Sequence, residues 1–261
     1  MEVIPCLDRD RAVALTARLI ETRLREKPDL VLGLATGRTM EAVYARLVES
    51  GVSFSSCTTF NLDEYVGLRP EDPNSYAAYM RRHLFDHVDV DLRRTHLPDG
   101  MTPDLRRAAE EYEAAIAAAG GIDLQLLGIG TAGHIGFNEP LSAFRSRTRD
   151  KMLTPTTRAQ NAEMFGGDAS LVPKRALTMG VGTILDSREL VLLACGTDKA
   201  EVLSQAVEGP LASRISASAI QLHPSCIVVV DRDAAAGLRD IDHYASVFDL
   251  EEKWDSYRDL A

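Results

Sequence analysis

The sequence predicts an α/β fold built on a doubly wound, mostly parallel sheet that is covered by helices on both faces. Short apolar runs of strand length alternate along the chain with longer segments whose apolar residues recur at helical spacing. The runs are apolar throughout rather than at every second residue, which is typical of strands buried on both faces. Three of the runs end in turns that contain glycine and polar residues.

The elements follow from the periodicity of the apolar residues. The first helix places Val13, Ala17, Ile20 and Leu24 on one face and is stopped by Pro28. Helices are expected at residues 10–26, 39–50, 74–85, 103–119 and 198–207. Strands are expected at residues 30–34, 57–62, 124–129, 190–195 and 226–230.

Composition restricts the class of protein. The 261 residues contain no Pro/Ser-rich linker, repeat or low-complexity tract, so residues 1–261 are expected to form a single domain. The net charge of −10 disfavours a role on nucleic acid or on a membrane surface. No apolar stretch approaches the roughly 20 residues that span a bilayer, and the N-terminal residues lack the features of a signal peptide. The four cysteines are scattered, which favours reduced thiols and a cytoplasmic protein.

The most informative segment covers residues 128–140 and reads GIGTAGHIGFNEP directly after an apolar run. It places His134 and Glu139 at the carboxyl end of an expected strand, where ligands bind in open α/β sheets. A carboxylate can hold and polarise an imidazole, whose pKa lies near neutrality. The alternative is an ordinary turn with a surface histidine.

Two further strand ends carry polar groups. Residues 35–39 read ATGRT, and a glycine turn that opens a helix presents free N–H groups to a phosphate; Thr36, Gly37 and Thr39 would contribute donors and Arg38 a charge. Thr-Gly is equally an ordinary helix N-cap. Lys199 stands at the start of another helix, where its charge opposes the helix dipole unless an anion is present; otherwise it is a surface lysine.

The acids Asp63 and Glu64 follow the strand expected at 57–62 and are flanked by apolar residues. A partly buried carboxylate there would have a raised pKa and could act as a general base, whereas helix capping and salt bridging would give the same pattern. The six histidines are dispersed and the glycine spacing does not fit a dinucleotide site, so neither a metal nor a cofactor is expected. Together the strand ends suggest proton transfer on a small phosphorylated metabolite.

At these residues the chain resembles the glucosamine-6-phosphate deaminase/isomerase family. The matching motifs are LGLATG at 32–37, FNLDEYVGL at 60–68, NSY at 74–76, GHIGFNEP at 133–140, SRTR at 146–149, VPKRALTMGVGTIL at 172–185 and ASAIQLHP at 217–224. The resemblance implies a Rossmann-like fold and a cofactor-free conversion of glucosamine 6-phosphate and water to fructose 6-phosphate and ammonia.

The resemblance also assigns roles to single residues. His134, supported by Glu139, would open the sugar ring, and Asp63 would carry a proton between C2 and C1. Thr36, Gly37, Thr39 and Lys199 would hold the phosphate. The resemblance further implies an allosteric site for N-acetylglucosamine 6-phosphate at the interface of a homo-oligomer, commonly a hexamer. Its anion-binding positions correspond to Ser142, Arg149 and Lys151.

Three positions depart from the family pattern. Ala132 stands where the family usually has an aspartate that orients the histidine, and Glu163 stands where it has a phosphate-binding arginine. Arg38 adds a cation to the 35–39 loop, so we expect Arg38 to reach the ligand anion, with Glu163 pairing to it or contacting another substrate group. These changes leave open a shifted substrate such as galactosamine 6-phosphate, or a sugar-phosphate-binding regulator without turnover. Lactone hydrolysis, as in the related phosphogluconolactonases, fits the DEY and FNEP segments less well.

Overall fold

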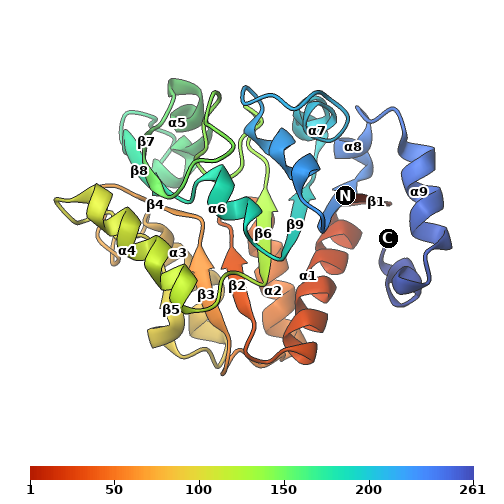
Figure 1. Ribbon diagram of the computed structural model, residues 1–261, viewed down its shortest axis with the longest axis horizontal. Coiled ribbons are helices and arrows are strands. Elements are labelled where there is room, and N and C mark those ends of the chain that lie inside the picture. The colour runs from red at the N-terminus through yellow and green to blue at the C-terminus, as the bar shows by residue number, and fades with distance from the viewer.

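The computed structural model describes residues 1–261 and has a seven-stranded sheet at its centre (Figure 1). The seven strands run parallel in the order β1-β10-β9-β6-β2-β3-β5. They are β1 (Glu2–Cys6), β2 (Val31–Leu34), β3 (Thr58–Asn61), β5 (Thr95–His96), β6 (Leu124–Gly128), β9 (Glu189–Ala194) and β10 (Cys226–Asp231). The predicted α/β fold with a mostly parallel sheet is confirmed.

The α-helices connect these strands. They are α1 (Arg9–Glu26), α2 (Arg38–Ser50), α3 (Tyr76–His83), α4 (Leu105–Ala118), α5 (Pro155–Asn161), α6 (Val181–Leu185), α7 (Ala200–Val207), α8 (Arg232–Ala235) and α9 (Ile241–Leu250). Right-handed crossovers put α1, α2 and α3 on one face of the sheet and α4, α6 and α7 on the other, because the strand order reverses between the two sets. The 3-10 helices are η1 (Phe85–His87), η2 (Leu92–Arg94), η3 (Ala162–Phe165), η4 (Thr197–Lys199), η5 (Ser216–Leu222) and η6 (Glu252–Leu260).

The strand order reverses between β2 and β6. From β2 the chain proceeds outward through β3 to β5, and from β6 it proceeds in the opposite direction through β9 to β10. The loops that leave the carboxyl ends of two such neighbouring strands diverge to opposite faces and open a crevice between them, where ligands bind in sheets of this kind. Both glycine-rich segments singled out in the sequence, residues 35–39 and 128–140, begin at this crevice.

A second, three-stranded antiparallel sheet lies beside the first, and the apolar pattern did not predict it. Its strands β4 (Asp63–Tyr65), β8 (Arg175–Thr178) and β7 (Arg149–Met152) are short. Most residues of β4 and β7 are charged, so the small sheet lacks the apolar runs that mark the central one. The two sheets meet at Leu62, whose N–H donates to Leu34 O at 3.0 Å while its carbonyl accepts from Met179 N at 2.7 Å.

Some helices and strands differ from those expected from the sequence. Helix α3 begins at Tyr76 rather than residue 74, because Ser75 caps it by accepting from Ala78 N, and it ends before η1. Lys199 lies at the start of a helix as expected, but in the 3-10 turn η4, which continues directly into α7 with Lys199 as the N-cap of α7. The edge strand β1 was missed because it contains Pro5, which an edge tolerates.

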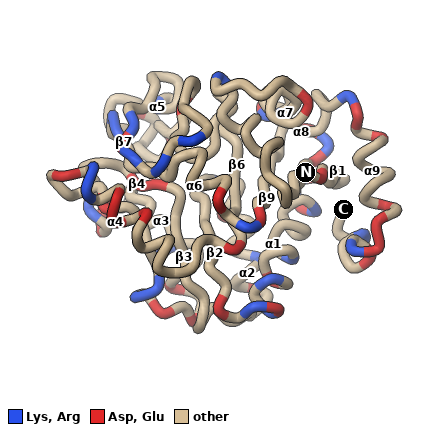
Figure 2. The backbone as a smooth tube through the Cα atoms, in the orientation of Figure 1, with Lys and Arg blue, Asp and Glu red and all other residues tan.

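Charged residues of both signs are interspersed over the outer helices and loops (Figure 2). Few lie on the strands of the central sheet, whose side chains form the main apolar core with those of α1 and α2. None of the helices combines the length and the apolar character that crossing a membrane would require.

Candidate functional site

His134 lies in the loop that follows β6 and is buried, with 8% of its surface exposed. Its ring packs over Gly130, where a side-chain methyl group would come within 2.2 Å of Nε2, so the loop can hold the imidazole here only with glycine at this position. Nδ1 lies 3.9 Å from Oε2 of Glu139 and has no hydrogen-bond partner. Burial lowers the pKa of His134; the Glu139 charge opposes this shift and the Lys199 charge adds to it. The imidazole is therefore neutral near pH 7.

Thr154 holds the Glu139 carboxylate in place. This carboxylate accepts hydrogen bonds from the N–H of Thr154 at 2.9 Å and from the Thr154 hydroxyl at 3.3 Å. Thr154 is the N-cap of α5, so the start of that helix orients Glu139 toward His134. The structure thus brings His134 and Glu139 together, but at a distance too long for a direct hydrogen bond.

Asp63 opens β4 and faces the same loop. A methyl group at Gly136, which has φ of +54°, would lie 3.3 Å from Oδ2 of Asp63, so the backbone of the His134 loop approaches the carboxyl closely. Burial raises the pKa of Asp63 to about 8, and the neighbouring charge of Glu64 adds to the shift. The Phe137 N–H and the Thr178 hydroxyl act in the opposite direction. A carboxyl group in this state can both accept and return a proton near neutral pH.

The 35–39 loop leads into α2. Gly37 has φ of +121°, a conformation that favours glycine, and its carbonyl accepts a hydrogen bond from the Tyr79 hydroxyl at 2.8 Å. Thr36 and Thr39 on either side are half-buried. No side chain caps the start of α2, which follows the carboxyl end of β2 at the crevice.

Arg38 and Glu163 form an ion pair with 2.7 Å between Nη1 and Oε2. Glu163 lies in η3, so the pair joins the 35–39 loop to a segment 125 positions later in the chain, counting from residue 38 to residue 163. Both side chains remain largely exposed, at 77% and 69%. Of the two arrangements considered for Glu163, the structure contains the pairing with Arg38.

Lys199 lies at the carboxyl end of β9, next to β6 in the sheet. Its Nζ is 3.0 Å from Oδ2 of Asp198, and its side chain is 20% exposed. Because β9 and β6 are parallel neighbours, Lys199 and the His134 loop leave the same edge of the sheet. The 35–39 loop, His134, Asp63 and Lys199 therefore converge from four separate strand ends.

Ser142, Arg149 and Lys151 are arranged around the segment that follows the His134 loop. Ser142 is buried and donates to Glu139 O at 2.7 Å, and Arg149 donates to Oδ1 of Asn138 at 2.8 Å. Lys151 follows two residues later on β7 and therefore lies on the same face of the strand as Arg149. Burial lowers the pKa of Arg149. Two of the three residues thus contact the chain next to Glu139.

Sequence reasoning missed the residues that orient the site. Thr154 holds Glu139, and Thr178 accepts from Phe137 N at 3.1 Å beside Asp63. Ala132, half-buried two residues before His134, supplies no polar group to the imidazole. Threonines in short polar strands and caps give no periodic signal, so only three-dimensional contacts reveal them.

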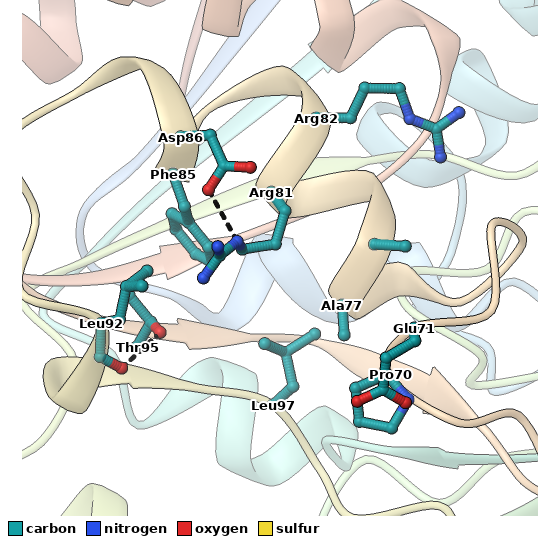
Figure 3. A pocket seen from close by; sticks show the side chains of 11 residues that line it. Pro70, Glu71, Ala77, Arg81, Arg82, Phe85, Asp86, Leu92, Thr95 and Leu97 are labelled. Atoms are coloured by element: carbon teal, nitrogen blue, oxygen red, sulfur yellow. Dashed lines mark hydrogen bonds and ion pairs between the residues drawn. The ribbon is translucent and has the colours of Figure 1, made fainter.

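A cavity lies apart from these residues, beside α3. It has a volume of about 760 Å³ and is lined by residues of α3, of η1 and of the segments on either side of them (Figure 3). Its walls include Ala77, Arg81, Phe85, Asp86, Leu92 and Leu97, and Arg81 pairs with Asp86 at 2.6 Å. None of the residues that converge at the crevice lines it, so we assign the chemistry to the crevice, where buried titratable groups meet, and not to this groove.

Fold and site together define an α/β protein with a buried imidazole and two buried carboxyl groups at the switch point of a parallel sheet. The family model described as glucosamine-6-phosphate isomerases/6-phosphogluconolactonase matches residues 9–229, and the chain belongs to this family.

Its relatives match over almost their whole length. The chain is 53% identical over 244 residues to a glucosamine-6-phosphate deaminase of Rhodopirellula baltica, covering 92% of this chain and 96% of that protein. It is 44% identical over 258 residues to one of Streptomyces coelicolor, covering 97% and 99%. A solved structure, described as a monomeric glucosamine-6-phosphate deaminase, superposes with a TM-score of 0.88 at 43% identity over 91% of this chain and 100% of that one. A 6-phosphogluconolactonase of Trypanosoma brucei shares the fold, with a TM-score of 0.72 at 20% identity, covering 91% and 98%.

Proposed function

We propose that the protein is an amino-sugar phosphate deaminase that converts glucosamine 6-phosphate and water to fructose 6-phosphate and ammonia. The observation that carries the proposal is the close approach of the buried Asp63 carboxyl to the loop that presents His134 and Glu139. The family relation supports the choice of substrate, since relatives 44–53% identical over most of the chain are glucosamine-6-phosphate deaminases.

The first step is opening of the sugar ring. A neutral imidazole can take the proton from the anomeric hydroxyl and return one to the ring oxygen, and burial keeps His134 neutral. Glu139, anchored by Thr154, stabilises the imidazolium that forms transiently. The product is the open-chain aldehyde.

The second step moves a proton between neighbouring carbons. The Asp63 carboxylate removes the proton from C2, the electron pair forms the C1–C2 double bond, and the carbonyl oxygen at C1 takes up the proton that the substrate ammonium group releases, which gives an enolamine. The Asp63 carboxyl then delivers its proton to C1. The nitrogen at C2 becomes an imine, to which water adds, and ammonia leaves to give the ketose. The carbon skeleton undergoes internal oxidation and reduction only, so the reaction requires no external electron acceptor.

The phosphate would bind at the 35–39 loop. The N–H groups at the start of α2, the hydroxyls of Thr36 and Thr39, and the charges of Arg38 and Lys199 suit an anion. Arg38 is paired with Glu163 in the structure. A phosphate must therefore compete with this carboxylate, and we propose that Arg38 changes partner when the substrate binds.

The regulatory features remain proposals as well. We infer that Ser142, Arg149 and Lys151 receive an anionic effector such as N-acetylglucosamine 6-phosphate, because Ser142 and Arg149 contact the segment that carries Glu139. We also propose that residues 1–261 form one domain and that the protein is cytoplasmic. The effector site would lie at an interface of a homo-oligomer. Light scattering at increasing protein concentration tests the assembly; the solved relative is described as monomeric.

Ammonia release from glucosamine 6-phosphate tests the proposed function. We expect turnover of glucosamine 6-phosphate by the wild-type chain and its loss by at least 10³-fold in Asp63→Asn, which removes the base but keeps the shape. Because only ionised Asp63 can remove a proton and its pKa is about 8, kcat/KM should fall about tenfold per pH unit below that value.

Galactosamine 6-phosphate and unphosphorylated glucosamine are the matched comparisons in that assay. Preferential turnover of galactosamine 6-phosphate would assign the shifted substrate. Tight binding of N-acetylglucosamine 6-phosphate without turnover of any sugar would contradict deaminase activity and favour a regulator.

Ala132→Asp tests whether ring opening is weakened in this protein. The added carboxylate would lie two residues from His134 and stabilise its charged form, so we expect kcat to rise several-fold. Ala132→Asn, which adds similar bulk without charge, is the control. A kcat that is the same in both variants and in the wild type, on each amino-sugar phosphate, would show that ring opening does not limit the reaction.

Arg38→Gln and Glu163→Gln test the proposed exchange of partners. Loss of the guanidinium should raise KM for glucosamine 6-phosphate about tenfold, because a charge-assisted contact to phosphate is lost. Loss of the competing carboxylate should lower KM several-fold. Neither change should affect unphosphorylated glucosamine. An unchanged KM in Arg38→Gln would remove Arg38 from the phosphate site.

A further inference from the structure

Glu64 is a buried acid that takes no part in the proposed proton transfers. It is 4% exposed, and its carboxylate accepts three backbone hydrogen bonds. They come from Tyr65 N at 2.7 Å, Tyr76 N at 3.0 Å and Ala77 N at 2.9 Å. Tyr76 and Ala77 are the first two residues of α3, so Glu64 fastens the start of this helix to strand β4.

The same helix holds the 35–39 loop. Its Tyr79 hydroxyl donates to Gly37 O at 2.8 Å, and its Tyr76 hydroxyl lies beside Thr36 and donates to the Tyr65 hydroxyl at 3.4 Å. An unbroken series of contacts therefore runs from β4 through Glu64 and α3 to the loop. Any displacement of α3 would move the loop relative to Asp63.

Successive residues of a strand point to opposite sides, which separates the two acids of β4. Asp63 points toward Gly136 and Thr178, whereas Glu64 points toward the start of α3. The two carboxyl groups are nevertheless neighbours in a dry environment, where like charges interact strongly. Burial raises the pKa of both carboxyl groups; the charge of Glu64 adds to the shift of Asp63, and the charge of Asp72 adds to that of Glu64.

The remaining titratable groups around Asp63 are phenols. Tyr65 from β4, Tyr76 from α3 and Tyr112 from α4 all experience its charge, and burial keeps their pKa values raised, so they stay neutral. Glu64 is thus the neighbouring group whose ionisation acts on Asp63. Burial raises the pKa of Glu64, and its three N–H donors oppose this shift by stabilising the charged form.

We propose that Glu64 is a positioning residue of the proton-transfer site, which fixes α3, and through Tyr76 and Tyr79 the 35–39 loop, relative to Asp63. This inference rests on the proposed function for its kinetic readout. It explains why two adjacent acids are present: one faces the reacting atoms, and the other holds the binding loop at a set distance while its charge acts on the first.

Glu64→Gln tests the proposal, since it keeps the size of the side chain but removes the charge and puts an NH₂ group where one N–H donor needs an acceptor. The acidic limb of kcat/KM against pH should move down by on the order of one unit, because repulsion on Asp63 is lost. KM for glucosamine 6-phosphate should rise roughly tenfold, because the loop loosens. A variant that keeps either the wild-type pH limb or the wild-type KM overturns the proposal.

Glu71→Gln is the matched control. Glu71 is an exposed acid on the turn that leads to α3, and its removal should leave both the pH limb and KM within twofold of wild type. An equal shift in Glu71→Gln would show a general effect of charge and overturn a specific role for Glu64.

Two further measurements keep the test decisive. If Glu64→Gln does not fold, Tyr79→Phe removes only the hydroxyl bonded to Gly37 and should raise KM several-fold with an unchanged pH limb; an unchanged KM overturns the link from α3 to the loop. If the wild-type chain releases no ammonia, the proposed function fails independently. In that case the pKa of the Asp63 carboxyl, measured by ¹³C NMR titration, replaces the pH limb, and the Kd of glucosamine 6-phosphate, measured by calorimetry, replaces KM. The expected changes in each variant, and the outcomes that overturn the proposal, stay as stated.

Discussion

The arrangement of the site depends on the two hydrogen bonds of Leu62, which join the large sheet to the small one. Its N–H donates to Leu34, the last residue of β2, and its carbonyl accepts from Met179, the residue after β8. The chain therefore leaves one sheet and enters the other within a single residue. Asp63 follows at once and is buried between the two sheets. Without this junction the carboxyl would stand at an ordinary strand end in water, with an ordinary pKa.

Burial then dictates the chemistry of the neighbouring groups. Desolvation favours the neutral form of any titratable side chain, which raises the pKa of Asp63 and lowers that of His134. Each group is thereby prepared to exchange a proton near neutral pH. The groups that oppose the rise in the pKa of Asp63 are a backbone N–H and a hydroxyl. A cation in their place would keep Asp63 ionised throughout the neutral range.

The sequence predicted five of the seven strands of the central sheet, and the residues that converge on them, because both leave strong local signals. Apolar runs mark buried strands, and the glycines of residues 128–140 mark a loop that must approach side chains closely, as Gly130 and Gly136 do. The topological rule for parallel sheets then gathers strand ends that are far apart in the chain.

The small sheet and its consequences could not be predicted in the same way. The strand RDKM is charged at three of four positions, so its pairing is set by tertiary contacts and not by periodicity. The capping of α3 by Glu64 likewise depends on a strand 12 residues earlier in the chain. The pairing of Arg38 with Glu163 could be proposed from their opposite charges, because the two departures occur together.

Transfer of deuterium from C2 to C1 tests the central claim, that a buried Asp63 carries the proton, most directly. With [2-²H]glucosamine 6-phosphate in ordinary water, mass spectrometry of the product measures how much label reaches C1. A carboxyl that is shielded from water should deliver a measurable share of the deuterium to C1 of fructose 6-phosphate before exchange occurs. Product that carries only solvent hydrogen at C1, formed at the full rate of ammonia release, would contradict transfer by a buried Asp63.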